Sequence, residues 1–421
     1  MVMCKFVTES GVGLKGQLIM INYAVVGIGN FGARHLEAAR NIASAGLANF
    51  VAVADIRLSA FPDIVKELRG QGVSCYENHV EMIAAHPELD LVTLPLPIQL
   101  HAKMAIDCME RGLNVLVEKP PAPTLAEARQ IAEAVQRTGK LCGVSFQLNS
   151  SLLLRTMCNI VAAGKLGTVQ SLSSLNLTQR YDSYYARTPW AGKIRANGAI
   201  VRDGTLNNPF AHNAQFLFTV AQAAAGALVQ PVELEAELFA GHDIETEDTT
   251  SIRARLSSGA MLNFYSSVCT AENNLQRMRI EGTKGVINWD NANDPQAQVE
   301  YSDGMVETLP NVVPNLASND TVSHGGTTEA MFRNFIEVLE GKSSRLACPI
   351  EDTLAFAEFV EKTFEGEKIT HLHDTPYAIR VEVEANGQQQ IATYLQDAAA
   401  YLKEAYTTGK LLSEIGAPWA K

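Results

Sequence analysis

The sequence has no long hydrophobic run, no closely spaced pair of cysteines and no unbroken run of Lys and Arg. A transmembrane helix needs about 20 mostly apolar residues in a row, so no membrane partner is expected. The seven cysteines are scattered and form no C-x-x-C motif, which argues against a zinc ribbon or a disulfide framework and favours reduced thiols in the cytoplasm. A net charge of −12, without a Lys/Arg run, argues against nucleic acid as a partner. What remains is an ordinary globular chain of 421 residues.

The beginning of the chain does not look like a targeting segment. Residues 1–19 have neither the apolar core nor the small-residue cleavage site of a signal peptide. Met20, a second candidate start, directly precedes the first expected strand. We therefore expect a disordered leader over residues 1–19, a nucleotide-binding domain over residues 20–146 and a second domain over residues 147–421.

A glycine-rich turn follows the first buried strand, Tyr23–Val26, and leads into an expected helix, Ala33–Ala45. In a dinucleotide-binding βαβ unit, Gly27 would make the tight turn and Gly29 would let the backbone approach a pyrophosphate. Gly32 would let the helix pack closely on the strand. The helix N-terminus then offers N–H groups and a partial positive charge to the phosphates. The motif predicts a dinucleotide site, against the alternative of a structural turn that binds nothing.

The second strand, Phe50–Ala54, ends in Asp55, about 20 residues past the last glycine, where an acidic residue can bind the adenosine ribose. Asp55 would accept hydrogen bonds from both ribose hydroxyls and repel a 2′-phosphate, which favours NAD. Arg57 could instead pair with that phosphate, so NADP stays open. The plainer interpretation of Asp55 is a turn cap.

Strands and helices alternate up to residue 146, which predicts a parallel, doubly wound α/β sheet. Thr124-x-x-Glu127 is a capping box that opens one of these helices, and Gly139 ends it. Ligands of such sheets bind beyond the carboxyl ends of the strands. The further strands expected here are Asp90–Leu96, Asn114–Glu118 and Lys140–Phe146.

Past residue 150 the pattern changes to alternating apolar and polar residues, as in Val232–Ala240, which indicates strands with one solvated face. Short turns link them, so we expect an α+β domain with a large open, mainly antiparallel sheet. The other strands expected are Thr249–Leu256, Met261–Val268, Arg277–Glu281 and Val286–Trp289. The helices expected after them are Glu329–Leu339, Asp352–Phe364 and Gln388–Thr407.

Six motifs follow one another along the chain: Gly27–Gly32, Asp55, Pro97-x-x-x-His101, Glu118-Lys119-Pro120, Gly164-x-Leu166-Gly167 and Gly282–Gly285. With this set, the chain from Met20 onward resembles the glucose–fructose oxidoreductase and inositol dehydrogenase (Gfo/Idh/MocA) family. The resemblance implies a Rossmann domain, a second domain for substrate binding and oligomerisation, and NAD(P)-linked oxidation of a sugar or polyol. A homodimer or homotetramer is expected, also because a one-faced sheet would leave an apolar surface.

The resemblance also implies where the cofactor and the substrate bind. Ile98 departs from the family pattern, which usually has Asn there. More importantly, Asn208 stands where the family usually has Asp, four residues before His212, while Asp203 lies nearby but out of register. Whether Asn208 or Asp203 replaces the usual aspartate is left open. The residues expected at the cofactor are Gly27, Gly29, Asn30, Phe31, Asp55, Arg57, Pro97, His101, Glu118 and Lys119.

Oxidation of a secondary alcohol needs a hydride acceptor, a base for the hydroxyl proton and a cation for the developing alkoxide. NAD would accept the hydride. Lys119 would lower the pKa of the hydroxyl, His212 would take its proton near neutral pH, and Asn208 would orient His212 or hold a substrate hydroxyl. The alternatives are a surface lysine at a strand end and a core or helix-capping histidine.

Residues 180–202 carry five basic residues against one acid, Asp182, which is unusual in an acidic chain. This segment is either a solvated loop or the lid of a site for a polar or anionic substrate. His371-x-His373 lacks a third ligand at metal spacing, so exposed turn residues are favoured and no metal is expected. The residues expected to bind substrate are Tyr184, Tyr185, Arg187, Trp190, Lys193, Asn208 and His212.

Two other functions are compatible with the sequence. One is a glycosidase that keeps NAD bound and uses transient oxidation, a known variation in the family. The other is a non-catalytic sensor on the same scaffold, which Asn208 favours and the intact Lys119 disfavours. The sequence names no substrate.

Overall fold

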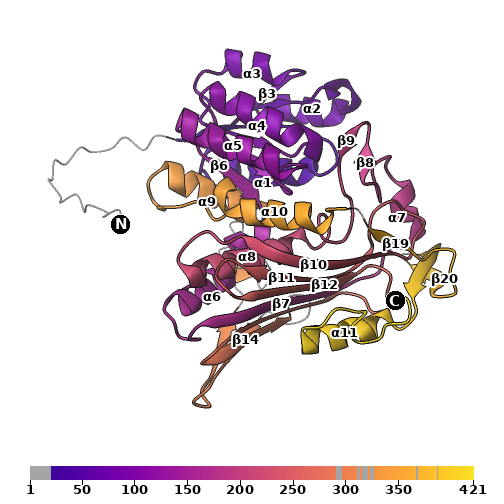
Figure 1. Cartoon of the computed structure of the whole chain (residues 1–421). Helices are drawn as coiled ribbons and strands as arrows, with labels where there is room; N and C mark the ends of the chain where they lie inside the picture. The colour runs from indigo at the N-terminus through magenta and orange to yellow at the C-terminus, as the bar shows by residue number, and fades with distance from the viewer. Residues whose placement is uncertain are drawn as a thin grey trace.

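The computed structural model describes residues 20–290, 296–310, 313–314, 321–322, 327–366, 368–385 and 387–421. The expected leader, residues 1–19, lies outside the described residues. Figure 1 shows an upper lobe formed by the N-terminal part of the chain and a lower lobe built on a broad sheet. Within the described residues, no helix is both long enough and apolar enough to cross a membrane.

The upper lobe is the expected doubly wound sheet. All of its strand pairs are parallel, and the strand order reverses between β1 and β4, where ligands of such sheets bind. In sheet order, the strands are β3 (Ser74–Tyr76), β2 (Asn49–Ala54), β1 (Asn22–Val26), β4 (Leu91–Leu94), β5 (Asn114–Glu118) and β6 (Cys142–Ser145). The helices are α1 (Gly32–Ser44), α2 (Pro62–Gly70), α3 (His79–Ala85), α4 (His101–Glu110) and α5 (Leu125–Thr138), with short 3-10 turns at Leu58–Ala60 and Ile98–Leu100.

The capping box at the start of α5 forms as the sequence predicts. The Thr124 hydroxyl oxygen accepts a hydrogen bond from the Glu127 backbone N–H at 3.2 Å, and the Thr124 hydroxyl lies 2.8 Å from the Glu127 carboxylate. Gly139 ends the helix in the left-handed conformation, with φ of 67°.

The lower lobe is a nine-stranded sheet. Most neighbours are antiparallel, but β7 pairs parallel with β12, and β10 pairs parallel with β19, so the sheet is mixed. In sheet order, the strands are β16 (Val306–Pro310), β15 (Gln296–Tyr301), β14 (Gly285–Asp290), β13 (Leu275–Gly282), β7 (Val169–Leu177), β12 (Met261–Ser267), β11 (Thr249–Leu256), β10 (Pro231–Ala240) and β19 (Ile369–His371). Smaller pairs are β8 (Arg195–Ala196) with β9 (Ala199–Ile200), β17 (Val313–Pro314) with β18 (Thr321–Val322), and β20 (Ala378–Ala385) with β21 (Gln388–Leu395).

Helices cover both faces of this sheet, as Figure 1 shows. The face toward the upper lobe carries α8 (Ala211–Ala225) and α10 (Leu354–Thr363), and the opposite face carries α11 (Ala398–Thr408). The other helices of this half are α6 (Leu152–Ala162), α7 (Asp182–Ala186) and α9 (Thr328–Leu339), with 3-10 turns at Gln147–Ser150 and Ile350–Thr353.

One expected helix is wrong. The segment Gln388–Thr407 is not a continuous helix, because Gln388–Leu395 forms β21 and only Ala398–Thr408 is helical. The strand is stabilised by antiparallel pairing with β20, whose residues alternate apolar and charged. Local helix propensity therefore loses to a partner strand that lies directly before it in the chain.

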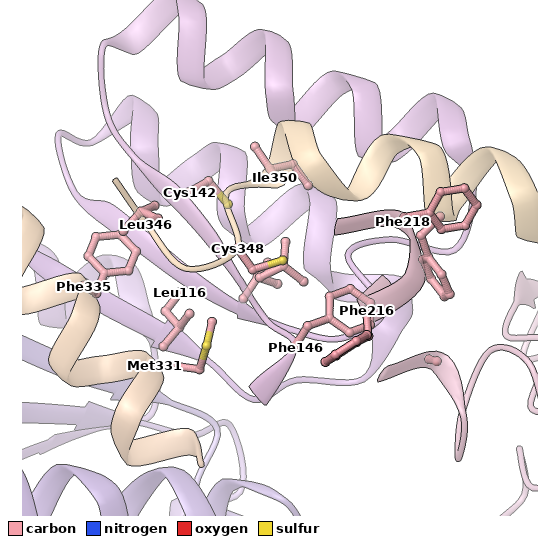
Figure 2. Packing of buried hydrophobic residues seen from close by; sticks show 14 of the residues in the cluster. Leu116, Cys142, Phe146, Phe216, Phe218, Met331, Phe335, Leu346, Cys348 and Ile350 are labelled. Carbon is pink, nitrogen blue, oxygen red and sulfur yellow. The ribbon is translucent and has the colours of Figure 1, made fainter. Parts of the chain in front are cut away.

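The two lobes meet around Phe146, which directly follows β6 (Figure 2). Figure 2 shows Phe216 of α8 next to it, and Met331 and Phe335 of α9 further along the same cluster. The residues before α10 extend the upper sheet, since the Val144 N–H donates to the Cys348 carbonyl at 2.8 Å. This packing fixes α8 relative to the carboxyl ends of β5 and β6.

The apolar surface expected to drive oligomerisation is covered within the chain. Leu234 and Ala236 of β10 pack against the core on the side of α10, and Leu238 is buried. The opposite side of β10 carries glutamates that pair with Arg253 and Arg255. The apolar side of this strand therefore gives no ground for an oligomer, whose existence stays a prediction.

Candidate active site

The glycine-rich turn has the close contacts that the motif requires. Gly27 has a φ of +97°, and its N–H donates to the Ala54 carbonyl at 2.8 Å. A Cβ at Gly32 would lie 2.3 Å from the Gly27 carbonyl oxygen, so α1 can begin against the turn only with glycine there. A Cβ at Gly29 would lie 2.9 Å from the Phe61 ring. Any side chain would fill the cradle in front of the N-terminus of α1, which fits a bound pyrophosphate.

Asp55 holds this turn in place. One carboxylate oxygen accepts from the Ile28 N–H at 2.9 Å, and the other accepts from the Arg57 N–H at 2.8 Å. Each oxygen keeps a lone pair for a ribose hydroxyl. The Arg57 guanidinium lies 3.5 Å from the position of a Cβ on Gly29, so both residues that bear on the choice between NAD and NADP face the same cradle.

Solvent-accessible residues surround the cradle. Asn30, with a φ of +51°, and Phe31, 47% exposed, lead into α1, and Pro97 is exposed beyond the end of β4. His101 differs, because it is buried and both of its ring nitrogens lie 2.8 Å from backbone carbonyls, those of Pro120 and Leu96. Burial lowers the pKa of His101. Its contacts place it as a brace for the loops around the cradle, with no ring nitrogen left for a cofactor.

The side chain of Glu118 binds the backbone N–H of Lys119. One oxygen of the buried Glu118 carboxylate accepts from the Lys119 N–H at 3.1 Å, and the other lies 2.9 Å from Nε2 of His35. The other ring nitrogen of His35 lies 2.9 Å from the Thr93 hydroxyl. Burial acts to raise the pKa of Glu118, but the hydrogen bond with His35 and the nearby charges lower it overall, so Glu118 stays ionised. Glu118 is therefore a positioning residue, and sequence reasoning missed its partner His35.

The Lys119 ammonium points at Asn208. Its Nζ donates to the backbone oxygen of Asn208 at 2.9 Å and to the side-chain oxygen at 3.2 Å. The Asn208 amide nitrogen in turn donates to a carboxylate oxygen of Asp203 at 2.5 Å and to the Tyr184 hydroxyl at 3.2 Å. The other Asp203 oxygen accepts from the Gly192 N–H at 2.9 Å. An ammonium has three N–H donors, so one remains for a substrate oxygen.

Asn208 and Asp203, the two candidates for the aspartate that the family usually has here, both lie beside Lys119. Asn208 contacts Lys119 directly, and Asp203 lies one hydrogen bond behind it. Burial lowers the pKa of Lys119, and the charges of Glu118 and Asp203 oppose that shift. Burial raises the pKa of Asp203, against the hydrogen bonds from Gly192 and Asn208. A buried amine with a neutral amide as its nearest partner can share a proton with a substrate more readily than an exposed lysine.

His212 lies in the first turn of α8, where its ring meets Phe146 edge to face at 5.7 Å. Its Nδ1 is buried and has no hydrogen-bond partner among the described residues. Burial lowers the pKa of His212 to about 3, and the charge of Lys119 adds to that shift. The imidazole is therefore neutral near pH 7.

The aromatic and basic residues of the 180–202 segment face different parts of the molecule. Tyr184 contacts Asn208, as described above, whereas Tyr185 packs its ring 4.8 Å from that of His242. Lys193 forms an ion pair with Glu245 at 2.9 Å, and Trp190 is 37% exposed. Of the residues expected to bind substrate, Tyr184, Asn208 and His212 thus lie around Lys119, while Tyr185 and Lys193 have partners elsewhere.

A second buried polar cluster lies next to Tyr185, and no sequence pattern predicts it. His242 Nδ1 lies 2.9 Å from an Asp248 oxygen and 3.0 Å from the Cys269 sulfur. The same carboxylate accepts backbone N–H groups of Gly241 and His242. These contacts hold together the ends of three neighbouring strands. The spacings in sequence, 242, 248 and 269, match no ligand pattern, so only the fold could bring the three side chains together.

The fold and the glycine-rich turn together define a protein with a Rossmann domain of the dinucleotide-binding kind. Residues 21–146 match the model of the oxidoreductase family with an NAD-binding Rossmann fold, and residues 154–288 match the GFO/IDH/MocA C-terminal domain. These matches span more than half of the chain, which belongs to the Gfo/Idh/MocA family of oxidoreductases. The expected family, fold class and NAD-binding Rossmann fold are confirmed.

Curated relatives are distant. Inositol 2-dehydrogenase from Rhizobium meliloti (strain 1021) is 24% identical over 68% of this chain and 80% of its own length. A 1,5-anhydro-D-fructose reductase from Ensifer adhaerens is 24% identical over 51% of this chain. The chain spans only 61% of that reductase and 45% of a 4-carboxy-2-hydroxymuconate-6-semialdehyde dehydrogenase from Sphingobium, so it covers less than two thirds of several relatives it matches.

Solved structures share the fold over most of the chain. An inositol dehydrogenase homologue from Azotobacter vinelandii, in complex with NAD+, superposes with a TM-score of 0.68 at 18% identity, over 83% of this chain and 96% of its own. The WlbA dehydrogenase from Bordetella pertussis, in complex with NADH and UDP-GlcNAcA, gives 0.63 at 19% identity, over 82% and 97%. At these identities the likeness shows the fold.

Proposed function

We propose that this protein is an NAD-dependent dehydrogenase that oxidises a secondary CH–OH group of a sugar, polyol or related small hydroxy compound. The observation that carries the proposal is the half-buried Lys119 ammonium, which is held by Asn208 and has one N–H left at the carboxyl edge of the sheet. The nearby His212 has an unpartnered ring nitrogen. A sensor that only binds ligand has no need of this pairing of cation and proton acceptor.

Each residue has a definable task in this reaction. When bound in the cradle formed by the turn at Gly27–Gly32, NAD supplies the hydride acceptor. Lys119 donates its remaining N–H to the substrate oxygen and stabilises the charge that develops there. His212 receives the hydroxyl proton. Asn208 fixes Lys119, and Asp203 fixes Asn208.

We also propose a cellular compartment, a domain boundary and an oligomeric state for the protein. We place the protein in the cytoplasm, because six of its cysteines are free thiols in the described part of the chain. A domain boundary near residue 146 is supported by the change from the parallel sheet to the mixed sheet. The homodimer or homotetramer stays a prediction, and sedimentation at micromolar concentration would test it.

The test is a panel of sugars, polyols and sugar acids, read by the appearance of NADH absorbance, with Lys119→Ala as the inactive control. Turnover of any member by the unaltered protein, lost in Lys119→Ala, supports the proposal. NAD binding without turnover of any class of hydroxy compound would refute it and favour a sensor. Tight retention of NAD with no net NADH and with glycoside cleavage would favour the glycosidase.

A further inference from the structure

Two guanidinium groups converge on the side chain that borders the Lys119 site. The Cζ atoms of Arg180 and Arg187 lie 3.8 and 3.7 Å from the centroid of the Tyr184 ring. The Tyr184 hydroxyl accepts from the amide of Asn208, the residue that holds Lys119. Both arginines thus stand directly beside the proposed reaction centre.

The other basic residues of the segment are engaged elsewhere or far from this ring. Lys193 pairs with Glu245, and the guanidinium of Arg202 lies 5.1 Å from the Phe364 ring. Arg195 is exposed on β8. Only two of the five basic residues of this segment, Arg180 and Arg187, therefore lie at Tyr184.

The two arginines at Tyr184 act on the Asp203 carboxylate by charge. Neither Arg180 nor Arg187 forms an ion pair with any described residue. Among the described residues, two carboxylates belong to the hydrogen-bond network of the site. Asp203 accepts from Gly192 and Asn208, and Glu118 accepts from the Lys119 N–H. With Lys119, three cations thus face two acids, Asp203 and Glu118, in a chain with a net charge of −12. Stacking uses the faces of a guanidinium and leaves its N–H donors at the edges available for a ligand.

We propose that Arg180 and Arg187 form an anion subsite, and that the substrate is a sugar-derived hydroxy acid whose carboxylate binds there while its CH–OH lies at Lys119. This inference rests on the proposed dehydrogenase function. In the reaction the CH–OH carbon gives a hydride to NAD+ and its hydroxyl gives a proton to His212, which leaves a carbonyl. The carboxylate is unchanged. A planar carboxylate matches the fork of a guanidinium, and a phosphate offers related chemistry that the experiment distinguishes.

The experiment compares matched pairs of compounds that differ in a carboxylate: D-gluconate with sorbitol and D-galacturonate with D-galactose, and a sugar phosphate as a third arm. Rates are read by NADH absorbance. Binding is read separately, by the thermal unfolding midpoint of the NADH-loaded protein with each compound. We expect the acids to be preferred in both readouts, and more strongly at low ionic strength.

Three variants test whether the preference for acids depends on Arg180 and Arg187. Arg187→Gln, at an exposed position, should raise KM for the acid about 10- to 100-fold, the scale of a lost charge-assisted hydrogen bond, and should change KM for the neutral partner much less. Arg180→Lys keeps the charge but loses the fork, so it should give a smaller rise in KM. Arg195→Gln removes an equal charge from the same segment and should change nothing.

The outcomes separate this inference from the function on which it rests. Turnover of neutral compounds with no preference for acids, or an acid KM that Arg187→Gln leaves unchanged, would overturn the subsite while the dehydrogenase stands. A preference for the sugar phosphate over both acids would show that the subsite binds an anion but that its ligand is not a carboxylate. Selective stabilisation by acids without any turnover would support the subsite and refute the dehydrogenase.

Discussion

Changing the charge at position 208 tests directly whether Lys119 is the group whose titration controls activity. Asn208 offers two oxygens to the Lys119 ammonium and passes an N–H to Asp203 at 2.5 Å. Asn208→Asp alone removes that N–H and brings two carboxylates into contact, so the pair would retain a shared proton. The double substitution Asp203→Asn with Asn208→Asp reverses the hydrogen bond and brings the negative charge to Lys119.

The size of the effect follows from the distance between the side-chain oxygen of Asn208 and the Lys119 nitrogen, 3.2 Å. With an effective dielectric constant of about 20, attraction between unit charges at that distance has an upper limit of about 5 kcal/mol. Desolvation and relaxation reduce it, and close opposite charges usually shift a pKa by about 1 to 3 units. Burial lowers the pKa of Lys119 in the present protein, so the new carboxylate should move that pKa back upward.

The assay is the pH dependence of kcat/KM. If the reaction requires a protonated Lys119, activity falls as the pH rises through its pKa, and the double variant should move this alkaline limb upward by about 1 to 3 pH units. Asp203→Asn alone is the control, because it removes a carboxylate without placing one at Lys119. An alkaline limb that coincides in the double variant and the unaltered protein would show that Lys119 is not the titrating group.

Three further predictions concern the same site. Lys119→Ala should lower kcat about 10²-fold or more with NAD affinity nearly intact by calorimetry, and an unchanged kcat would remove Lys119 from the mechanism. Asp55→Ala should erode a preference for NAD over NADP, whereas equal affinities in the unaltered protein would assign the 2′-phosphate to Arg57. Because the pKa of His212 lies at about 3, its protonation should cost no activity as the pH falls from about 7 to 5. An acid limb in that range that disappears in His212→Ala would contradict this.

The sequence was most informative where a backbone requirement selects the residue. Gly27 and Gly32 are recognisable because a positive φ and a 2.3 Å approach admit no side chain, and the edge of the parallel sheet then places Lys119 near them. The resemblance placed His212 and Asn208 four residues apart, and the structure brings both to that edge. Local rules of this kind need no knowledge of distant contacts.

Elements defined by distant partners were missed. The central strand β7 (Val169–Leu177) contains buried Ser173, Ser174 and Asn176, so it shows no alternation of apolar and polar residues. Asn176 is satisfied by Ser174 and by the Tyr265 carbonyl, 89 residues away. A polar side chain in a doubly covered strand can be predicted only when its partners are known.

Glu247 is the clearest case of a residue near the site that the sequence could not reveal. It is 1% exposed, and a Cβ at Gly204 would lie 2.0 Å from its carboxylate, so it packs directly under the backbone that follows Asp203. Its oxygens accept from the Thr246 hydroxyl at 2.6 Å and the Leu206 N–H at 3.2 Å. In the sequence it is one of three acids between residues 245 and 248. Nothing local distinguishes it from its exposed neighbour Glu245.

The burial of Glu247 predicts how stability depends on pH. Burial raises its pKa from 4.5 to about 7, against the hydrogen bond from Thr246. Between these values the folded protein keeps a proton that the unfolded chain has lost, so this group makes stability fall as the pH rises from about 4.5 to 7, by roughly 3 kcal/mol in all. Glu247→Gln should remove that fall, so its thermal unfolding midpoint should exceed that of the unaltered protein at pH 8 but not at pH 5. Glu245→Gln, at an exposed ion pair, should keep the fall. If Glu247→Gln and the unaltered protein lose stability in parallel over this range, Glu247 is ionised when folded, and its hydrogen bonds outweigh its burial.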